Sequence, residues 1–318
     1  MLEFLNKRFT VVAGKGGVGK TTLSAALALA AAQQGKRVLI CQLDTTEKLG
    51  SMFGKPNRVG YEPCELAPNV YSVHIKAKLA LEEYGIMKLR FKRVYKMIFE
   101  NELVIRLLDL IPGMDELVMI GKAWYIEQEL DRNGRPRYDM VIVDSPATGH
   151  GVSLFRLPHV ILEAVTVGPL AEEMRKIQQL LMDPERSAMH IVTLAEEMPF
   201  NESFDLRRLQ RDVLRIPPGV CLVNAVYPET FDADEGDTLA RLFDETAPDP
   251  HDQVDAAIRA SWNYESRRRM QAQYLERYRR EMDLPVVEIP QLFCREIRRS
   301  ELDWLANFIL ALENREPE

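Results

Sequence analysis

The sequence has few cysteines and no long hydrophobic run. The four cysteines, Cys41, Cys64, Cys221 and Cys294, lie far apart, and no Cys-x-x-Cys pair is present. This spacing argues against a zinc site and a disulfide framework, so we expect reduced thiols. The alanine-rich stretch at 23–32 ends at two glutamines, well short of the roughly 18 apolar residues that a membrane-spanning helix needs.

The sequence also lacks an excess of positive charge. Its 48 acidic residues outnumber 41 lysines and arginines, and the formal net charge is -7. A negative field repels nucleic acid and anionic membrane surfaces, so we expect neither as a partner. The first nine residues hold no apolar stretch of signal-peptide length. These features predict a cytoplasmic protein without stable membrane insertion.

Short β-branched segments alternate with helical ones along the chain. A strand at residues 9–13 precedes a glycine-rich loop and an alanine-rich helix, and a second strand follows at 37–43. Further strands are expected at 70–75, 140–143, 164–167, 188–193, 220–224 and 285–289. This alternation predicts an α/β fold, a doubly wound and mostly parallel sheet flanked by helices.

Two segments interrupt this alternation. Residues 78–130 have no strand pattern, and their apolar residues and methionines are interleaved with Lys and Arg. We interpret them as an α-helical subdomain inserted into the domain. Residues 251–283 form a second, highly charged helical stretch. No internal repeat is present, so residues 1–318 are predicted to form a single domain.

The loop after the first strand matches the Walker A pattern in its proper context. Its sequence is Gly14-Lys15-Gly16-Gly17-Val18-Gly19-Lys20-Thr21-Thr22. Such a loop turns backbone N–H groups around the β-phosphate, and the following helix adds its positive end. Lys20 should reach the β- and γ-phosphates, Thr21 should ligate Mg²⁺, and Thr22 should lie nearer the α-phosphate. We therefore predict a P-loop NTPase that binds ATP with Mg²⁺.

Lys15 directly follows the first glycine, where an ordinary Walker A loop needs no lysine. With this lysine, the loop resembles the deviant Walker A class, which includes the arsenite-pump ATPases and the guided-entry factors for tail-anchored proteins. In that class the matching lysine reaches across a dimer interface to the partner's nucleotide. The resemblance implies a dimer and a catalytic role for Lys15; a solvated loop lysine is the alternative.

Two aspartates follow strands whose carboxyl ends should meet near this loop. Asp44 aligns with the first switch of the class, which implies that it orients the attacking water, although Asp44-Thr45-Thr46 replaces the usual Asp-Pro-Ala. An N-cap role for Asp44 is the alternative. Asp144 ends a hydrophobic strand, as a Walker B aspartate does, and is predicted to hold a magnesium-bound water.

The segment after Asp144, Ser145-Pro146-Ala147-Thr148-Gly149-His150, resembles the second switch of the arsenite-pump and guided-entry branch. That switch typically reads Asp-Thr-Ala-Pro-Thr-Gly-His. The resemblance implies that Thr148, Gly149 and His150 move with the nucleotide state and that His150 senses the γ-phosphate. A structural loop histidine is the alternative.

Resemblance to the same branch extends to the adenine side. Asn224 ends a strand and resembles the asparagine that pairs with the adenine edge. The second wall of that pocket is predicted to come from Pro290, Leu292 and Phe293. Residues 111–116 resemble the Pro-Gly-x-x-Glu of the helical subdomain, where switch motions reach the client surface. The methionines nearby fit either an open groove or a packed core.

These features together predict an enzyme, an ATPase that converts ATP and water to ADP and phosphate. The predicted catalytic residues are Lys15, Lys20 and Asp44. We expect a nucleotide-switched homodimer, or a heterodimer with a sister subunit, coupled to a hydrophobic helix or membrane-protein client. The alternative is a nucleotide-regulated chaperone or scaffold, or a heterodimer subunit, with incidental hydrolysis. An arsenite-efflux motor is less favoured, because no cysteine triplet is visible.

Overall fold

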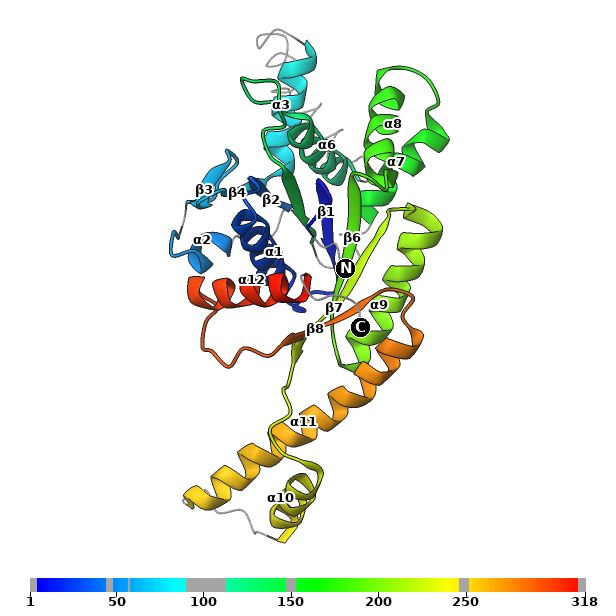
Figure 1. Ribbon diagram of the computed structural model, residues 1–318. Coiled ribbons are helices and arrows are strands. Elements are labelled where there is room, and N and C mark those ends of the chain that lie inside the picture. Colours follow the sequence, from blue (N-terminus) through cyan, green and yellow to red (C-terminus); the bar gives the residue numbers. More distant parts are fainter. Residues whose placement is uncertain are drawn as a thin grey trace.

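A computed structural model describes residues 5–43, 48–56, 58–89, 113–146, 153–245 and 252–313. Within these residues, one sheet of eight strands has the order β3-β4-β2-β5-β1-β6-β7-β8 (Figure 1). The strands are β1 (Phe9–Ala13), β2 (Val38–Leu43), β3 (Cys64–Ala67), β4 (Val70–Ile75), β5 (Met140–Asp144), β6 (Ser187–Leu194), β7 (Pro218–Val226) and β8 (Val286–Pro290). Only the β3–β4 pair is antiparallel. The predicted mostly parallel sheet is confirmed.

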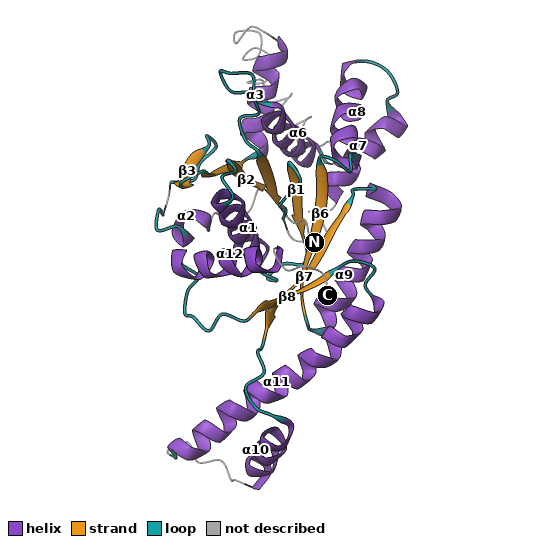
Figure 2. Ribbon diagram, in the orientation of Figure 1, coloured by secondary structure: helices purple, strands orange, loops and turns teal. Residues whose placement is uncertain are grey.

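Helices flank the sheet (Figure 2). They are α1 (Lys20–Gln33), α2 (Leu49–Met52), α3 (Ala77–Leu89), α6 (Met114–Gln128), α7 (Ser153–Ala164), α8 (Pro169–Met182), α9 (Glu197–Leu209), α10 (Ala233–Glu245), α11 (Gln253–Glu281) and α12 (Arg299–Glu313), with a π-helical turn at Gln210–Leu214. Among the residues that the structure describes, every helix is too short or too polar to span a bilayer.

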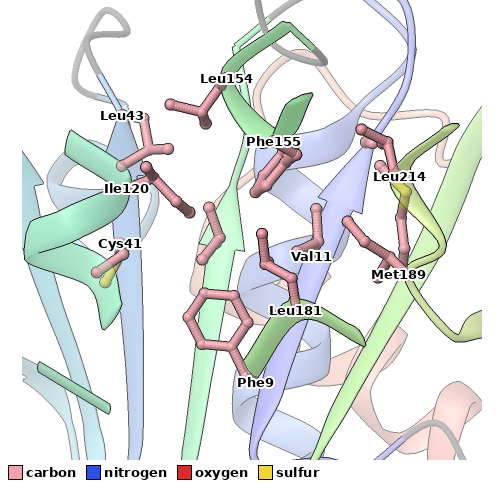
Figure 3. Close-up of a cluster of buried hydrophobic side chains, with 14 of the residues drawn as sticks. Phe9, Val11, Cys41, Leu43, Ile120, Leu154, Phe155, Leu181, Met189 and Leu214 are labelled. Atoms are coloured by element: carbon pink, nitrogen blue, oxygen red, sulfur yellow. The ribbon is translucent and has the colours of Figure 1, made fainter. Parts of the chain in front are cut away.

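The sheet buries a separate apolar core on each face. Helices α1 and α12 cover one face, where Val12, Ile40 and Ile142 pack beneath them. Helices α6, α7, α8, α9 and α11 cover the opposite face, which holds Phe9 and Val11 (Figure 3). Because successive strand residues point to opposite faces, the unbroken apolar runs of β1, β2 and β5 fill both cores. This burial fixes the strand ends that carry the candidate site.

Two strand predictions differ from the structure. The strand expected at 164–167 is wrong: α7 ends at Ala164, and the N–H of Val165 still bonds to the carbonyl of Ile161. The β-branched run that suggested a buried strand is on the surface, with Val167 78% exposed. The edge strand β3 was not predicted, because its four residues, Cys-Glu-Leu-Ala, include no β-branched or aromatic residue and so give little strand signal.

Both predicted helical segments contain helices, but these helices pack against different parts of the fold. Helices α3 and α6 lie within the 78–130 segment or at its start and pack against each other, while residues 90–112 lie outside the described residues. Helix α11 spans most of the 251–283 stretch. Its C-terminal half packs on the sheet through Leu275 and Tyr278, and its N-terminal half projects away from the sheet together with α10 (Figure 1). We call this α10–α11 hairpin the arm.

Candidate nucleotide site

The loop between β1 and α1 requires glycine at two positions. A Cβ atom on Gly14 would lie 2.1 Å from the carbonyl oxygen of Val192 in β6, so the loop can approach this strand only without a side chain. Gly19 has a φ of 97°, and a Cβ atom there would lie 2.2 Å from Nδ2 of Asn224. Gly16 and Gly17 lie exposed at the loop's tip. Glycine at these two positions therefore lets the loop's backbone lie close to β6 and β7 at the carboxyl edge of the sheet.

Lys20 lies inside this loop. Its ammonium donates hydrogen bonds to the carbonyls of Gly14 and Lys15, both at 2.9 Å. Burial lowers the pKa of Lys20, and the charge of nearby Asp144 opposes this shift. A buried ammonium that is bound only to neutral carbonyls gains from an incoming anion. The loop thus holds a cation where the phosphates of a nucleotide would lie.

Asp144 lies at the carboxyl end of β5 and faces the start of α1. The Thr21 hydroxyl donates to its Oδ2 at 2.7 Å, and the Ser24 hydroxyl donates to its Oδ1 at 3.4 Å. Burial raises the pKa of Asp144 to about 6, although both hydrogen bonds and the Lys20 charge act in the opposite direction. A nearby cation would restore the carboxylate.

These oxygen atoms fit a magnesium ion. Mg²⁺ usually keeps several waters and is held by one or two carboxylates together with substrate phosphates. The structure places the Thr21 hydroxyl and the Asp144 carboxylate beside each other at the phosphate loop. This pair would hold the ion, Thr21 directly and Asp144 through a bound water.

Lys15 points to a residue of its own chain. Its ammonium forms an ion pair with Glu202 of α9 at 2.9 Å, and both side chains are about one-third exposed. An ion pair in such a setting contributes little, about 1 kcal/mol or less. Lys15 is therefore held weakly and can be released.

The predicted adenine-side residues lie at the ends of β7 and β8. The amide nitrogen of Asn224 donates to the carbonyl of Val18 at 2.9 Å, which ties β7 to the phosphate loop. Pro290 ends β8 opposite Val226, and Leu292 packs against the α1-side core. The Phe293 ring is 65% exposed and lies edge-on to the Tyr227 ring, at 5.4 Å between centroids. Of these residues, Asn224 contacts the loop, and the role of all four in adenine binding stays a prediction.

Several predicted residues cannot be placed. Asp44 and the switch residues Thr148, Gly149 and His150 lie outside the described residues. In the sequence, Asp44 follows Leu43 at the end of β2, and the switch residues come after Pro146, just beyond β5. Both strands end at the same edge of the sheet as the loop. Their roles stay predictions.

The sequence analysis missed two side chains at this site. Ser24 follows Thr21 by three residues, so helical spacing places both hydroxyls on one face of α1 and could have revealed the second contact to Asp144. Glu202 lies on α9, far from Lys15 in sequence, and no motif near it indicated the pairing. Only the folded sheet brings these two side chains together.

A parallel sheet with a glycine-rich phosphate loop before α1 and a buried aspartate on the adjacent strand defines a P-loop nucleotide-binding protein. A sequence model of the anion-transporting ATPase family matches residues 7–168, just over half of the chain. The chain belongs to the anion-transporting ATPase family. The predicted resemblance and the prediction of an ATPase are thereby confirmed at the level of the family.

Curated relatives agree with this assignment. ATPase BagA of Mycobacterium tuberculosis is 27% identical over 234 residues, which cover 70% of this chain and 66% of BagA. The arsenical pump-driving ATPase of Escherichia coli is 25% identical over 71% of this chain and 40% of its own length. ATPase ASNA1 homolog 1 of Paramecium tetraurelia is 27% identical over 51% of this chain and 46% of that protein. The chain thus spans less than two thirds of each of these relatives.

Proposed function

We propose that this chain hydrolyses MgATP as a nucleotide-switched dimer and couples the cycle to a hydrophobic or membrane-protein client in the cytoplasm. The observation that carries the proposal is the joint placement of Lys20, Thr21 and Asp144 at one loop. A buried cation, a hydroxyl and a buried carboxyl group there match the three needs of bound MgATP: charge on the phosphates, an inner ligand and a water-holding ligand.

The chain's own residues would act in a simple order. On nucleotide binding, Lys20 exchanges its two carbonyl partners for β- and γ-phosphate oxygens, and loop N–H groups surround the β-phosphate. A cation bound beside Asp144 would favour the charged form of its carboxyl group. Asp44 is proposed from its sequence position to orient the attacking water. Magnesium, when bound, supplies charge neutralisation at the phosphates.

The ion pair of Lys15 supports a dimeric cycle. Lys15 pairs with Glu202 on α9. The resemblance to the deviant Walker A class implies that the matching lysine reaches across a dimer interface. We propose that Lys15 leaves Glu202 and reaches the partner's nucleotide when ATP closes the dimer.

The client surface is proposed to include the α7–α8 hairpin. Its apolar side chains Val160, Val165, Val167 and Leu170 are each between 38% and 78% exposed. Helix α7 packs against α6, and α6 packs against α3, so the hairpin continues the predicted helical subdomain (Figure 1). Exposed apolar side chains that gather at one end of a domain are typical of a protein-binding surface.

ATP turnover tests the enzyme assignment. We expect Lys20→Ala to lower kcat by about a hundredfold or more, since one charge at the transferred phosphate is removed. Asp44→Asn should lower it similarly. Lys7→Ala is the matched control, because Lys7 bonds only to the Pro184 carbonyl on the surface. Turnover that survives both Lys20→Ala and Asp44→Asn would rule out the mechanism.

Molar mass and co-purification test the rest of the proposal. Light scattering should show a dimer with ATP for Asp44→Asn and a return to monomer for Lys15→Ala. Activity that appears only after adding a sister subunit would favour the heterodimer. The Asp44→Asn variant should retain a hydrophobic client. The same variant with Val160, Val165 and Val167 replaced by serine should not retain it. Equal retention by both would exclude the α7–α8 surface.

A further inference from the structure

A row of polar residues crosses the sheet at the height of the Walker B aspartate. In the strand register, Gln42 of β2 lies beside Asp144 of β5, and His74 of β4 lies beside Gln42 on the other side. Side chains in register on neighbouring strands point to the same face, with backbones about 4.8 Å apart. Asp144 meets Thr21 and Ser24 of α1 on that face. Gln42 therefore points into the layer that holds the phosphate loop and α1.

The hydrogen bonds of Gln42 fix which end of its amide faces which way. Its Nε2 donates to the Ser72 hydroxyl at 3.3 Å, and Ser72 donates its own proton to the carbonyl of Ile40 at 3.2 Å. Because the Ser72 proton is already used, Ser72 must accept from Gln42, and a flipped amide would place two acceptors together. The nitrogen of Gln42 thus faces β4, and Oε1 forms the other branch of the amide.

The Oε1 atom of Gln42 is fully buried and, among the residues that the structure describes, accepts no hydrogen bond. The nearby hydroxyls of Thr21 and Ser24 already donate to Asp144. An unsatisfied buried acceptor costs about 1–3 kcal/mol, which a donor that arrives with a ligand would recover.

We propose that Gln42 is a positioning residue whose Oε1 accepts a hydrogen bond from a water of the hydrated magnesium ion that binds with the nucleotide. The proposal rests on the proposed function, because it needs MgATP or MgADP at the loop. Water on Mg²⁺ is a strong donor, and Asp144 and Gln42 lie in register on neighbouring strands with their side chains on the same face of the sheet. Gln42 then holds the ion's hydration shell on the side of β2.

The magnesium dependence of ADP binding tests this role without turnover. ADP affinity is measured by calorimetry in EDTA and across a Mg²⁺ titration, for wild type, Gln42→Met and Ser72→Ala. Methionine matches glutamine in length and removes Oε1. Ser72→Ala is the matched control, since it removes the partner of Nε2 and leaves Oε1 in place.

We expect Gln42→Met to raise the Mg²⁺ concentration at the binding midpoint by about tenfold, the usual effect of losing a partner of a metal's bound ligand. ADP affinity in EDTA should stay unchanged, and Ser72→Ala should leave the midpoint within about twofold of wild type. Thermal stability of the ligand-free chain should change little, because loss of the Nε2 bond to Ser72 is offset by removal of the unpaired buried acceptor. If Gln42→Met does not fold, Gln42→Leu provides the same loss of acceptor.

Three results would overturn the inference. An unchanged Mg²⁺ midpoint in Gln42→Met, with normal ADP binding, would remove Gln42 from the metal's surroundings and leave the ATPase proposal intact. An equal rise in Gln42→Met and Ser72→Ala would show a purely structural role for the pair. Absence of Mg²⁺-dependent ADP binding in wild type would instead contradict the proposed function, and the role of Gln42 with it.

Discussion

The phosphate-loop edge and the arm are held together by different forces. Helix α1 buries ten of its fourteen residues against the sheet, so apolar packing fixes Lys20, Thr21 and Ser24. Helix α10 buries only Gly236, and its contacts to α11 include the ion pair of Arg269 with Asp237. The edge is thus positioned by area removed from water, and the arm by ion pairs that salt and pH can weaken.

The arm nevertheless has a defined interior. The Glu265 carboxylate is fully buried and pairs with both Arg268 and Arg269 at 2.8 Å. Near the tip, the Phe243 and Trp262 rings pack at 5.8 Å between centroids. Charges inside a thin two-helix layer fix its geometry but add less stability than a core of the same size. From this difference we expect the projecting part of the arm to open more readily than the nucleotide edge.

The largest effect is expected at the nucleotide edge, from burial of Asp144. The pKa of Asp144 is raised to about 6 from an unfolded value of 3.8. The neutral form is therefore favoured by folding, and this stabilisation is complete below pH 3.8 and is lost as the pH rises through 6. Two pKa units correspond to about 3 kcal/mol.

Asp144→Asn should therefore stabilise the chain free of nucleotide and Mg²⁺ by up to about 3 kcal/mol at pH 8 and by little at pH 4. Urea unfolding at the two pH values measures this, and exposed Asp205→Asn on α9 is the control. A gain that does not depend on pH would show that burial does not set the ionisation of Asp144. Burial would then not distinguish the nucleotide edge from the arm in the way that its packing indicates.

A smaller and more local effect is expected in the arm, from Glu265→Gln. Hydrogen bonds from Arg268, followed by those from Arg269, lower the pKa of Glu265 against the effect of burial. The charged Glu265 therefore stabilises the fold at pH values above the ordinary carboxyl pKa. This stabilisation is lost as the pH falls through the lowered pKa of Glu265. Removing the charge should cost about 1–3 kcal/mol within the arm.

Hydrogen exchange of α10 amides measures this loss, which should appear without a comparable change in α1 protection. Glu276→Gln is the matched control, since Glu276 is an exposed carboxylate on the same helix. High salt should reproduce part of the effect in wild type. Equal loss of protection in α1 and α10 would show that the arm and the sheet unfold as one unit, which would end the distinction drawn above.

The same contrast explains what the sequence could predict. The strand-loop-helix unit around Gly14 and Lys20 was predictable, because its geometry follows from local residue types and a short spacing. Continuous apolar runs located β2 and β5, since both faces of these strands are buried. The placement of Thr21 and Asp144 at one site followed from the meeting of parallel strand ends, whereas the direct hydrogen bond between them was not predicted.

Features that depend on distant segments were not predictable. The charged pattern of 251–283 indicated a helix but not its packing against α10, which depends on Glu265 and Asp237 meeting through Arg269. The run at 164–167 has strand composition, yet no neighbouring strand is available to it and Val167 stays exposed. Only the structure identifies Oε1 as the unpaired end of the Gln42 amide, because it shows that Nε2 donates to Ser72.

The smallest predicted effect comes from an arm-like contact at the nucleotide edge, the ion pair of Lys15 with Glu202. Because both groups are partly exposed, breaking it changes the free energy by about 1 kcal/mol or less.

If the pair holds Lys15 back from a partner subunit, Glu202→Gln should lower the ATP concentration at the dimerisation midpoint by at most about fivefold. Sedimentation velocity across an ATP titration measures this, with Asp205→Asn of α9 as a control for loss of a neighbouring ion pair. A higher midpoint would mean that Glu202 serves the dimer, whereas an unchanged one would mean that Lys15 is not restrained.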